Sequence, residues 1–288
     1  MDAGLEAVSN ALSPVELWLD RWELEPDGEA IERNGAHVAF VRRGDRRSVL
    51  KVLKPNSDEM LGPAMLAHYQ GRSAVRVLGH EQNAVLLERA LPGTELTETV
   101  LAGRDDEAVR ILCSVMADLH QDDPPPGPWP TVEHWGRAFA RYRSGPPHDE
   151  VPPALLDRAE AEFMDLCATQ GRRFLLHGDL HHENVLDGGD RGWLVIDPKG
   201  VIGELAYETG AGLRNPGGAE DLYNDPRHIA RRVWIIAEAL GLPEERILRW
   251  SFAQAVLSAL WHVEDGDGDE AVAAAIVTAA AMRSLLPV

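Results

Sequence analysis

The chain has 288 residues, 44% of them hydrophobic, and a formal net charge of −19 with a sequence pI of about 4.9. Such a chain can bury a substantial core in one large domain or two. The acidic balance argues against a nucleic-acid partner, which would need clustered Lys and Arg, and no run approaches the roughly 18 to 20 apolar residues of a membrane span.

The two cysteines, Cys113 and Cys167, lie far apart in helical patterns. A disulfide scaffold or a thiolate metal site is therefore not expected, and a reducing cytoplasm is the natural location. We interpret both residues as small buried hydrophobes. Lysine occurs only at positions 51, 54 and 199, and every other basic residue is arginine, so each lysine is weakly informative about function.

The first segment, SPVELWLDRW, predicts a short helix. Ser13 is the expected N-cap, Pro14 lies in the first turn, and Glu16 completes a capping box. A strand-like pattern follows from about residue 23 to residue 53, with turn signals that predict successive antiparallel hairpins at residues 34–35 and 44–45.

A helix within SDEMLGPAMLAHYQG, ended by Gly71, and two strands in AVRVLG and NAVLLERA complete a small lobe of five strands and one main helix near residue 90. Helical periodicity then dominates the chain, in the segments 105–120, 154–170, 226–241, 245–264 and 269–286. The fold class expected is α+β, with a small antiparallel β lobe at 1–90 and a larger, mostly α lobe at 91–288.

One polar decade, HGDLHHENVL at 177–186, interrupts the helical lobe. It lies beside an apolar strand, and GWLVIDPKG follows after the turn DGGDRG. The histidines lack the i, i+4 spacing of a helical zinc site, and the chain has no G-x-S-x-G elbow for acyl transfer.

A kinase loop fits the decade better. Phosphoryl transfer needs a carboxylate that orients the attacking hydroxyl, oxygen ligands for Mg²⁺ and a cation on the phosphates. Asp179 is the predicted catalytic base, and Asn184 and Asp197 are the predicted metal ligands. Asn184 follows Asp179 at the interval of the kinase motif H-R-D-x-x-x-x-N, and Asp197 follows an apolar strand as the D-F-G aspartate does.

HGDLHHENVL and GWLVIDPKG, with GRSAVRVLG and NAVLLERALPG upstream, resemble the aminoglycoside phosphotransferases, and in particular the streptomycin 6-kinase and hydroxyurea phosphotransferase subfamily. The resemblance implies a two-lobed, protein-kinase-like fold, in which the lobe at 1–90 binds the nucleotide and the lobe at 91–288 carries catalysis and substrate binding. It also implies ATP and Mg²⁺ as cofactors and a small cationic antibiotic as acceptor, most plausibly streptomycin at its 6-hydroxyl, with hydroxyurea or a metabolite as the alternative. A nucleotide-binding module without turnover is a further alternative, and no protein partner is implied.

Lys51 matches the third-strand lysine that binds the α- and β-phosphates in this resemblance. Period-2 alternation places Val49 on the same face, where it would cover adenine, and turns Lys54 the other way. Glu59 is the expected partner of Lys51, unless Gly62-Pro63 begins the helix anew and leaves Glu59 as an ordinary acid outside it.

The segment LLERA should be the hinge that meets adenine through its backbone, at Glu88, Arg89 and Ala90. The chain has no G-x-G-x-x-G for the phosphates, so only the turn at 34–35 is available there. It also lacks an A-P-E motif after the metal aspartate, so a protein substrate is not expected.

His177 should orient the loop by hydrogen bonds to the backbone. Of the two adjacent histidines, we expect one to pack inward and the other to touch substrate, and His182 is the candidate. Two acid-rich segments, GELAYETG and LWHVEDGDGDE, would bind guanidinium groups of the acceptor by paired hydrogen bonds. The candidates for contact with the acceptor are Glu204, Glu208, Trp261, Glu264 and Asp265. The alternative is that the acids belong to a solvated loop and that the tryptophan packs in the core.

Overall fold

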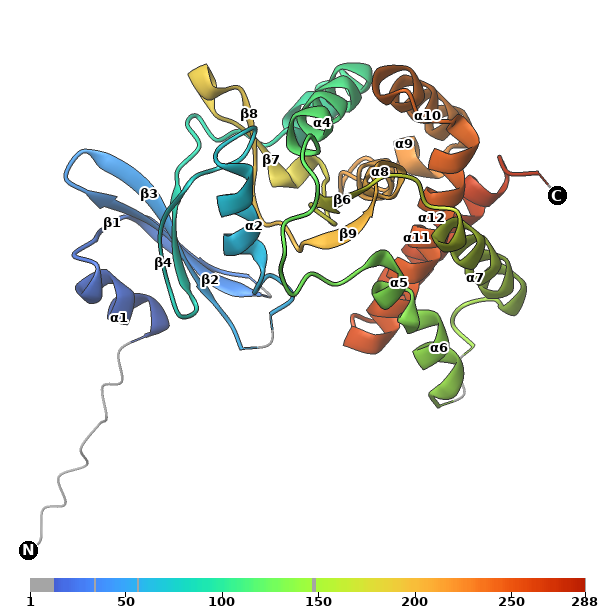
Figure 1. Cartoon of the computed structure of the whole chain (residues 1–288), viewed down its shortest axis with the longest axis horizontal. Coiled ribbons are helices and arrows are strands. Elements are labelled where there is room, and N and C mark those ends of the chain that lie inside the picture. The colour runs from blue at the N-terminus through green and yellow to red at the C-terminus, as the bar shows by residue number, and fades with distance from the viewer. Residues whose placement is uncertain (1–12, 34, 56, 147–148, 288) are drawn as a thin grey trace, which may run out of the picture.

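The computed structural model describes residues 13–33, 35–55, 57–146 and 149–287. A β-sheet lobe and a larger helical lobe lie side by side, with the helix α2 between them (Figure 1). The two-lobed α+β arrangement expected from the sequence is therefore confirmed. The predicted turn residue Asn34 lies outside the described residues.

The N-terminal lobe is one antiparallel sheet in the order β1-β2-β3-β5-β4. The capping box of the first helix is present, with Ser13 and Glu16 bonded reciprocally. The elements are α1 (Pro14–Arg21), β1 (Glu25–Glu32), β2 (Ala36–Arg43), β3 (Arg46–Leu53), α2 (Gly62–Tyr69), β4 (Val77–Glu81) and β5 (Ala84–Glu88).

Helix α2 is shorter than its sequence pattern. It begins at Gly62-Pro63, because proline is favoured in the first turn, and it ends at Tyr69, since Gln70 takes a left-handed conformation with φ 53°. A Cβ on Gly62 would lie 2.9 Å from the carbonyl oxygen of Pro198. Glycine therefore allows the start of α2 to approach the segment that follows Asp197.

The C-terminal lobe is mostly helical, with two short β pairs that carry the polar decade. Its helices are α3 (Thr97–Leu101), α4 (Asp105–Leu119), α5 (Val132–Trp135), α6 (Arg137–Ser144), α7 (Pro153–Ala168), α8 (Leu205–Leu213), α9 (Glu220–Asn224), α10 (Pro226–Leu240), α11 (Glu244–Asp265) and α12 (Asp269–Arg283). Its strands are β6 (Arg173–Leu176), β7 (Val185–Asp187), β8 (Trp193–Val195) and β9 (Val201–Glu204), with short 3₁₀ turns at His182–Asn184 and Gly189–Arg191.

The strand pairing frames the polar decade. β7 pairs with β8 across the predicted turn, whereas β6 pairs with β9 rather than with the hairpin. The decade thus runs from the end of β6 to the start of β7, and the metal candidate Asp197 lies just after β8. Strand ends of this kind hold polar side chains on rigid supports.

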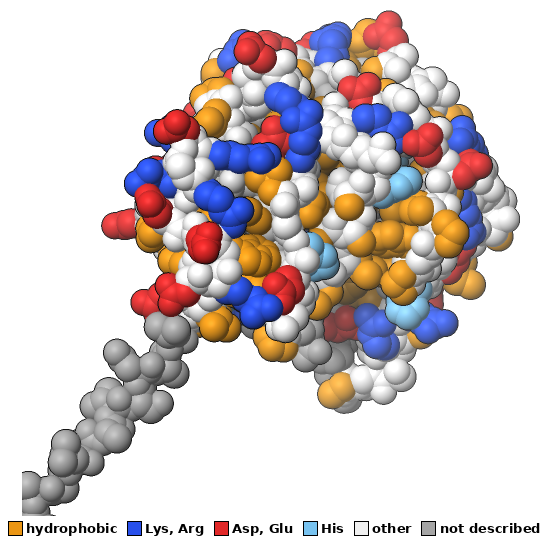
Figure 2. Space-filling model, turned by 60° about the vertical axis from the view of Figure 1, so that its left-hand side comes forward, with side chains coloured by type: hydrophobic (Ala, Val, Ile, Leu, Met, Phe, Trp, Pro, Cys, Tyr) orange, Lys and Arg blue, Asp and Glu red, His pale blue; other side chains and the backbone are white. Residues whose placement is uncertain are grey.

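A shared core joins the lobes. Met65 and Leu66 from α2 and Val85 from β5 belong to the same buried cluster as Val185 and Val195 from the C-terminal hairpin. A second cluster fills the helical lobe, where α11 is buried along most of its length. On the face in Figure 2, basic and acidic side chains are interspersed. In the part of the chain that is described, no helix has the length and apolar character needed to cross a membrane.

Candidate active site

The backbone of the polar decade is held by a buried carboxylate. Glu208, from α8, accepts hydrogen bonds from the backbone N–H groups of His177 at 2.6 Å and Gly178 at 2.9 Å. Its Oε2 also lies 3.1 Å from Nε2 of His120, at the end of α4. Gly178 has φ 85°, and a Cβ there would lie 2.7 Å from Trp135, so only glycine fits. Glu208 therefore fixes the start of the loop.

The ring of His177 joins the loop to the end of β8. Its Nε2 lies 2.8 Å from the carbonyl oxygen of Ile196, and the backbone N–H of Asp179 donates to its Nδ1 at 3.3 Å. Nε2 therefore carries the proton, and burial lowers the pKa of His177, which keeps the ring neutral. The prediction that His177 orients the loop through backbone groups is confirmed.

A chain of three ionisable side chains runs through the loop. His181 lies between two carboxylates, with its Nδ1 2.5 Å from Oε2 of Glu183 and its Nε2 3.7 Å from Oδ2 of Asp179. Burial alone would lower the pKa of His181, but hydrogen bonds and charges from Asp179 and Glu183 raise it to about 9. His181 is therefore a cation at neutral pH, a role that the sequence did not indicate.

Asp179 is correspondingly an anion. Burial would raise its pKa, but the neighbouring His181, with the charges of Lys199 and Arg214, holds the pKa of Asp179 well below its usual range. A carboxylate of this kind can orient a hydroxyl and accept its proton late in a reaction. It is too weak a base to remove that proton beforehand.

A lysine from the N-terminal lobe pairs with a carboxylate from the C-terminal lobe. Nζ of Lys51 lies 2.6 Å from Oδ1 of Asp197 and also forms an ion pair with Glu59. Glu59 lies outside α2, as the alternative interpretation held, but it still pairs with Lys51. Asp197 has φ 57°, a conformation that is costly for a non-glycine residue and that is found mainly at functional sites.

The donor set fits a hard divalent cation. The Nδ2 atom of Asn184 donates to the carbonyl oxygen of Asp179 at 2.9 Å, which leaves Oδ1 of Asn184 as the atom that a cation would take. Asn184 and Asp197 together offer one amide oxygen and one carboxylate. Mg²⁺ is commonly bound by one or two such protein groups together with phosphate oxygens and water. Among the described residues there is no cluster of three His, Cys, Asp or Glu side chains that would suit a metal held by protein alone.

The hinge side chains are engaged elsewhere. Glu88 pairs with Arg191, and Arg89 pairs with Asp27 at 2.7 Å and lies over the ring of Phe40. Ala90 is buried, and Val49 lies opposite Leu87 on the neighbouring strand. Contact of Val49 and of residues 88–90 with adenine stays a prediction, and at residues 88 and 89 it would have to use the backbone.

A pocket opens beside Asp179. It has a volume of about 330 Å³ and lies between the catalytic loop, the segment after α8, and the facing sides of α11 and α12. Its walls combine a few polar groups with an alanine-rich surface, and are formed by Asp179, Arg214, Asn215, Tyr223, Ala255, Ser258, His262, Ala271, Ala274, Ala275 and Thr278. Asp179 is therefore one of the polar groups that line a pocket large enough for a small molecule.

Arg214 was not anticipated from the sequence. Burial lowers the pKa of its guanidinium, which the charges of Asp179 and Tyr207 partly offset. Within the described part of the chain its side chain makes one hydrogen bond, from Nη1 to Oε1 of Gln254 at 3.1 Å. The segment GLRNP carries no pattern that distinguishes this arginine from a surface one.

Several predicted acceptor residues prove to be structural. Glu208 is 1% exposed and holds the loop, and Glu204 is 6% exposed and binds Arg246 and the indole of Trp250. His182 is fully buried, and burial lowers its pKa to about 3. Packing and internal partners occupy these three residues or close them off from the pocket, and their contact with substrate stays a prediction.

The remaining candidates lie towards the end of α11. Trp261 is partly buried and makes an edge-to-face contact with Trp135, so it belongs to the core, as its alternative held. Glu264 pairs with Arg141 at 2.8 Å. Asp265 is exposed. Neither acid lines the pocket, but both lie in the last turn of α11, which also carries the pocket residue His262.

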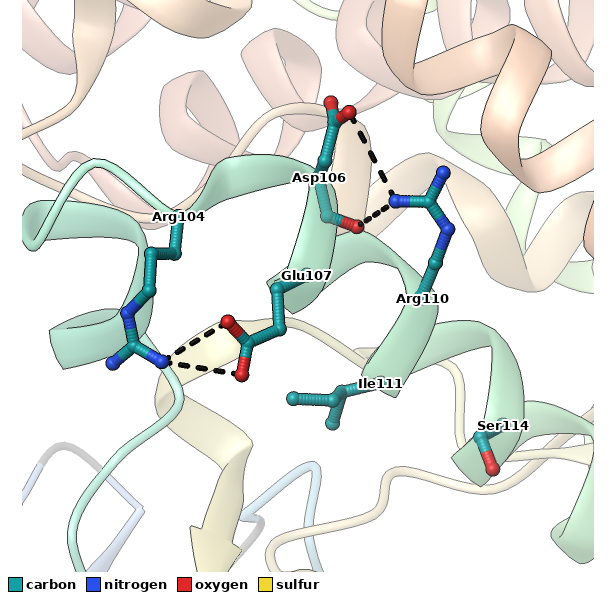
Figure 3. A pocket seen from close by; sticks show the side chains of 6 residues that line it. All are labelled: Arg104, Asp106, Glu107, Arg110, Ile111 and Ser114. Carbon is teal, nitrogen blue, oxygen red and sulfur yellow. Dashed lines mark hydrogen bonds and ion pairs between the residues drawn. The ribbon is translucent and has the colours of Figure 1, made fainter.

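A larger hollow on α4 has no such chemistry (Figure 3). Its charged side chains pair with each other, Arg104 with Glu107 and Arg110 with Asp106. Such exposed i, i+3 and i, i+4 pairs are ordinary features of a solvated helix face. The hollow also lies apart from the catalytic loop, so we assign it no role.

The sequence matches the family described as aminoglycoside/hydroxyurea antibiotic resistance kinases over residues 21–266. The chain belongs to this family of kinases. It is 37% identical to streptomycin 3''-kinase of Klebsiella pneumoniae over 255 residues, which cover 86% of this chain and 92% of that one. It is 31% identical to streptomycin 6-kinase of Streptomyces griseus, with 86% and 81% of the two chains covered. Hydroxyurea phosphotransferase of Kitasatospora aureofaciens is 32% identical, with 92% and 77% covered.

Solved structures support the fold independently. A thermostable mutant of aminoglycoside phosphotransferase APH(4)-Ia, in complex with AMP-PNP and hygromycin B, matches with a TM-score of 0.70 at 18% identity, over 96% of this chain and all of that one. An ethanolamine kinase of Plasmodium vivax matches with a TM-score of 0.63 at 14% identity, over 92% and 83%. These likenesses show the fold. The family match and the relatives named kinases make the chain a phosphotransferase, and the alternative of a module without turnover is set aside.

Proposed function

We propose that this kinase transfers the γ-phosphoryl group of Mg-ATP to the 6-hydroxyl of streptomycin and so gives resistance to the antibiotic. The observation that carries the proposal is the position of Asp179, which lines the acceptor pocket on a loop whose His177 ring bonds to Ile196, the residue before the Lys51 partner Asp197. In the proposed reaction, Asp179 orients the acceptor hydroxyl and receives its proton as the bond to phosphorus forms. Bound Mg²⁺, held by Asn184 and Asp197, would neutralise phosphate charge.

The charge distribution of the pocket suits an acceptor with cationic ends. Between the pocket residues His262 and Ala271, the end of α11, the turn after it and the start of α12 carry five exposed acids, which are Glu264, Asp265, Asp267, Asp269 and Glu270. Streptomycin carries two guanidinium groups, which carboxylates bind by charge-assisted hydrogen bonds. The acids would draw these groups to the rim of the pocket, while a hydroxyl reaches Asp179 deeper inside. Relatives named streptomycin kinases add support.

Hydroxyurea is the second candidate, and one observation favours it. The pocket itself holds one carboxylate, Asp179, opposite one guanidinium, Arg214, and several alanines. Because one negative and one positive side chain offset each other, this interior can accept a small neutral molecule that carries no cationic group. Arg214 would then bind a carbonyl oxygen of the acceptor, and a relative named hydroxyurea phosphotransferase is consistent with this choice.

A substrate panel tests the proposal. The purified kinase and Mg-ATP are combined in a coupled ADP-release assay with streptomycin, hydroxyurea or a kanamycin-type aminoglycoside, each beside the variant Asp179→Asn. We expect streptomycin-dependent ADP release that falls by at least about 10²-fold in the variant. Turnover with hydroxyurea alone would replace streptomycin by the second candidate. An Asp179→Asn variant with wild-type turnover would remove Asp179 from the mechanism.

A further inference from the structure

In the proposed reaction the γ-phosphoryl group crosses the gap between Lys51 and the acceptor pocket. Glu59 and Asp197 share Lys51, Asp179 lines the pocket, and Asp58, next to Glu59 in the chain, pairs with Lys199. A phosphoryl group that leaves ADP spreads negative charge over three oxygens, so a cation besides Lys51 and bound Mg²⁺ would stabilise it.

Lys199 is a cation placed at this gap. It lies two residues after Asp197, and its backbone N–H donates to the carbonyl oxygen of His177 at 2.9 Å, with the next N–H at 3.2 Å from the same oxygen. These bonds fix the backbone of Lys199 against the start of the catalytic loop.

The partner of Lys199 is weakly held. Nζ of Lys199 forms an ion pair with Asp58, whose side chain is 67% exposed, whereas the side chain of Lys199 is 21% exposed. An ion pair with an exposed carboxylate contributes little stability, about 0 to 1 kcal/mol. A phosphate group that carries more charge and enters the cleft would therefore displace Asp58 readily. A lysine suits this exchange, because its ammonium is a compact charge on a flexible stem.

We propose that Lys199 binds the γ-phosphoryl group during its transfer and leaves Asp58 for the phosphoryl oxygens. This inference rests on the proposed use of ATP. In the step, the acceptor oxygen forms a bond to the γ-phosphorus, and the bond between that phosphorus and the β–γ bridging oxygen breaks. ADP leaves with the electron pair, and the hydroxyl proton passes to Asp179. Lys199 contributes charge and donates hydrogen bonds without losing a proton.

The ion pair of Lys199 and Asp58 has an alternative role, which is to hold the two lobes together as a latch. Asp58 belongs to the N-terminal lobe and Lys199 to the C-terminal lobe, so a latch would need both partners equally. Phosphoryl binding needs Lys199 alone. The variants Lys199→Met and Asp58→Asn therefore separate the two roles. Lys54→Met is the matched control, because Lys54 pairs with the exposed Glu32 on the sheet lobe.

The experiment measures the affinity of each variant for ADP and for AMP-PNP in the presence of Mg²⁺, and kcat with whichever acceptor the wild type uses. For Lys199→Met we expect unchanged ADP affinity, AMP-PNP affinity weaker by about 10-fold, and kcat lower by about 10²-fold or more, as for other groups that stabilise transition-state charge. Lys199→Arg should recover part of the AMP-PNP affinity. Asp58→Asn should bind AMP-PNP at least as tightly as wild type and keep kcat within about threefold.

Three results would overturn the inference. The first is a Lys199→Met variant that loses ADP and AMP-PNP affinity equally or loses neither. The second is an Asp58→Asn variant with the same loss of kcat as Lys199→Met, which would establish the latch. The third is a wild type that binds neither nucleotide, which would overturn the use of ATP as well. Lys199-dependent AMP-PNP binding without phosphorylation of streptomycin would instead leave Lys199 in place and contradict the acceptor proposal.

Discussion

Replacing Glu208 with glutamine should destabilise the protein rather than weaken substrate binding alone. Glu208 is 1% exposed, accepts two backbone hydrogen bonds at 2.6 and 2.9 Å, and faces His120. Hydrogen bonds to a charged group contribute roughly 1.5 to 3 kcal/mol each. Glutamine keeps one acceptor oxygen but directs an NH₂ group at the other donor. We therefore expect a loss of about 3 kcal/mol in the free energy of unfolding.

Urea denaturation of the ligand-free protein at pH 7 measures this loss. Glu264→Gln is the matched control, since it removes an exposed carboxylate that pairs with Arg141 and should cost less than about 1 kcal/mol. Burial would raise the pKa of Glu208, but His120, His177 and the N–H of Gly178 lower it below its ordinary value. The contribution of Glu208 is thus fully present above the unfolded pKa of about 4.3 and is lost as the pH falls through the lower folded pKa.

The difference between wild type and Glu208→Gln should accordingly shrink in acid, because a protonated carboxyl group resembles the amide. A Glu208→Gln variant with unfolding free energy within about 0.5 kcal/mol of wild type, combined with a raised KM for the acceptor, would refute this reasoning. That result would favour the prediction that Glu208 contacts the substrate.

Three further changes test other parts of the site and core. His181→Gln removes the cation beside Asp179, so the pKa of Asp179 should rise and the acid limb of the kcat profile should move to higher pH; an unshifted limb would contradict the pairing. Gly136→Ala places a Cβ 2.1 Å from the ring of Phe163 and should lower the unfolding free energy by about 1 to 3 kcal/mol, measured in urea. Burial raises the pKa of Cys113 to about 12, so a disulfide reagent at pH 8 should label this thiol far more slowly in the native than in the unfolded protein, and equal rates would argue against its burial.

The sequence predicts the parts of the molecule that depend on local pattern. The capping box at Ser13, the five strands and the loop of Asp179 and Asn184 follow from side-chain spacing and turn chemistry, which act over a few residues. The start of α2 at Gly62 could also be predicted, because proline is favoured in the first turn of a helix. The early end of α2 was not, since Gln70 gives no sign of its left-handed conformation.

The acceptor pocket could not be predicted in the same way. Acidic residues near the motifs were the only local signal, yet Glu204 and Glu208 are buried by contacts with Arg246 and His120, which lie far away in the chain. Arg214 enters the pocket only because α8, α11 and the catalytic loop pack together. Whether a charged side chain stabilises the fold or contacts a ligand depends on tertiary packing, which the residues next to it in the sequence do not indicate.

The most direct test of the account is the position of the phosphate on the product. Streptomycin treated with wild-type kinase and Mg-ATP is isolated and examined by ³¹P–¹H correlation NMR, with Asp179→Asn as the parallel sample. The account predicts one phosphate, coupled to the proton on C6 of the streptidine ring, and no product from the variant. A phosphate at another hydroxyl would contradict the proposed site of transfer, and unmodified streptomycin from an enzyme that phosphorylates hydroxyurea would contradict the proposed substrate.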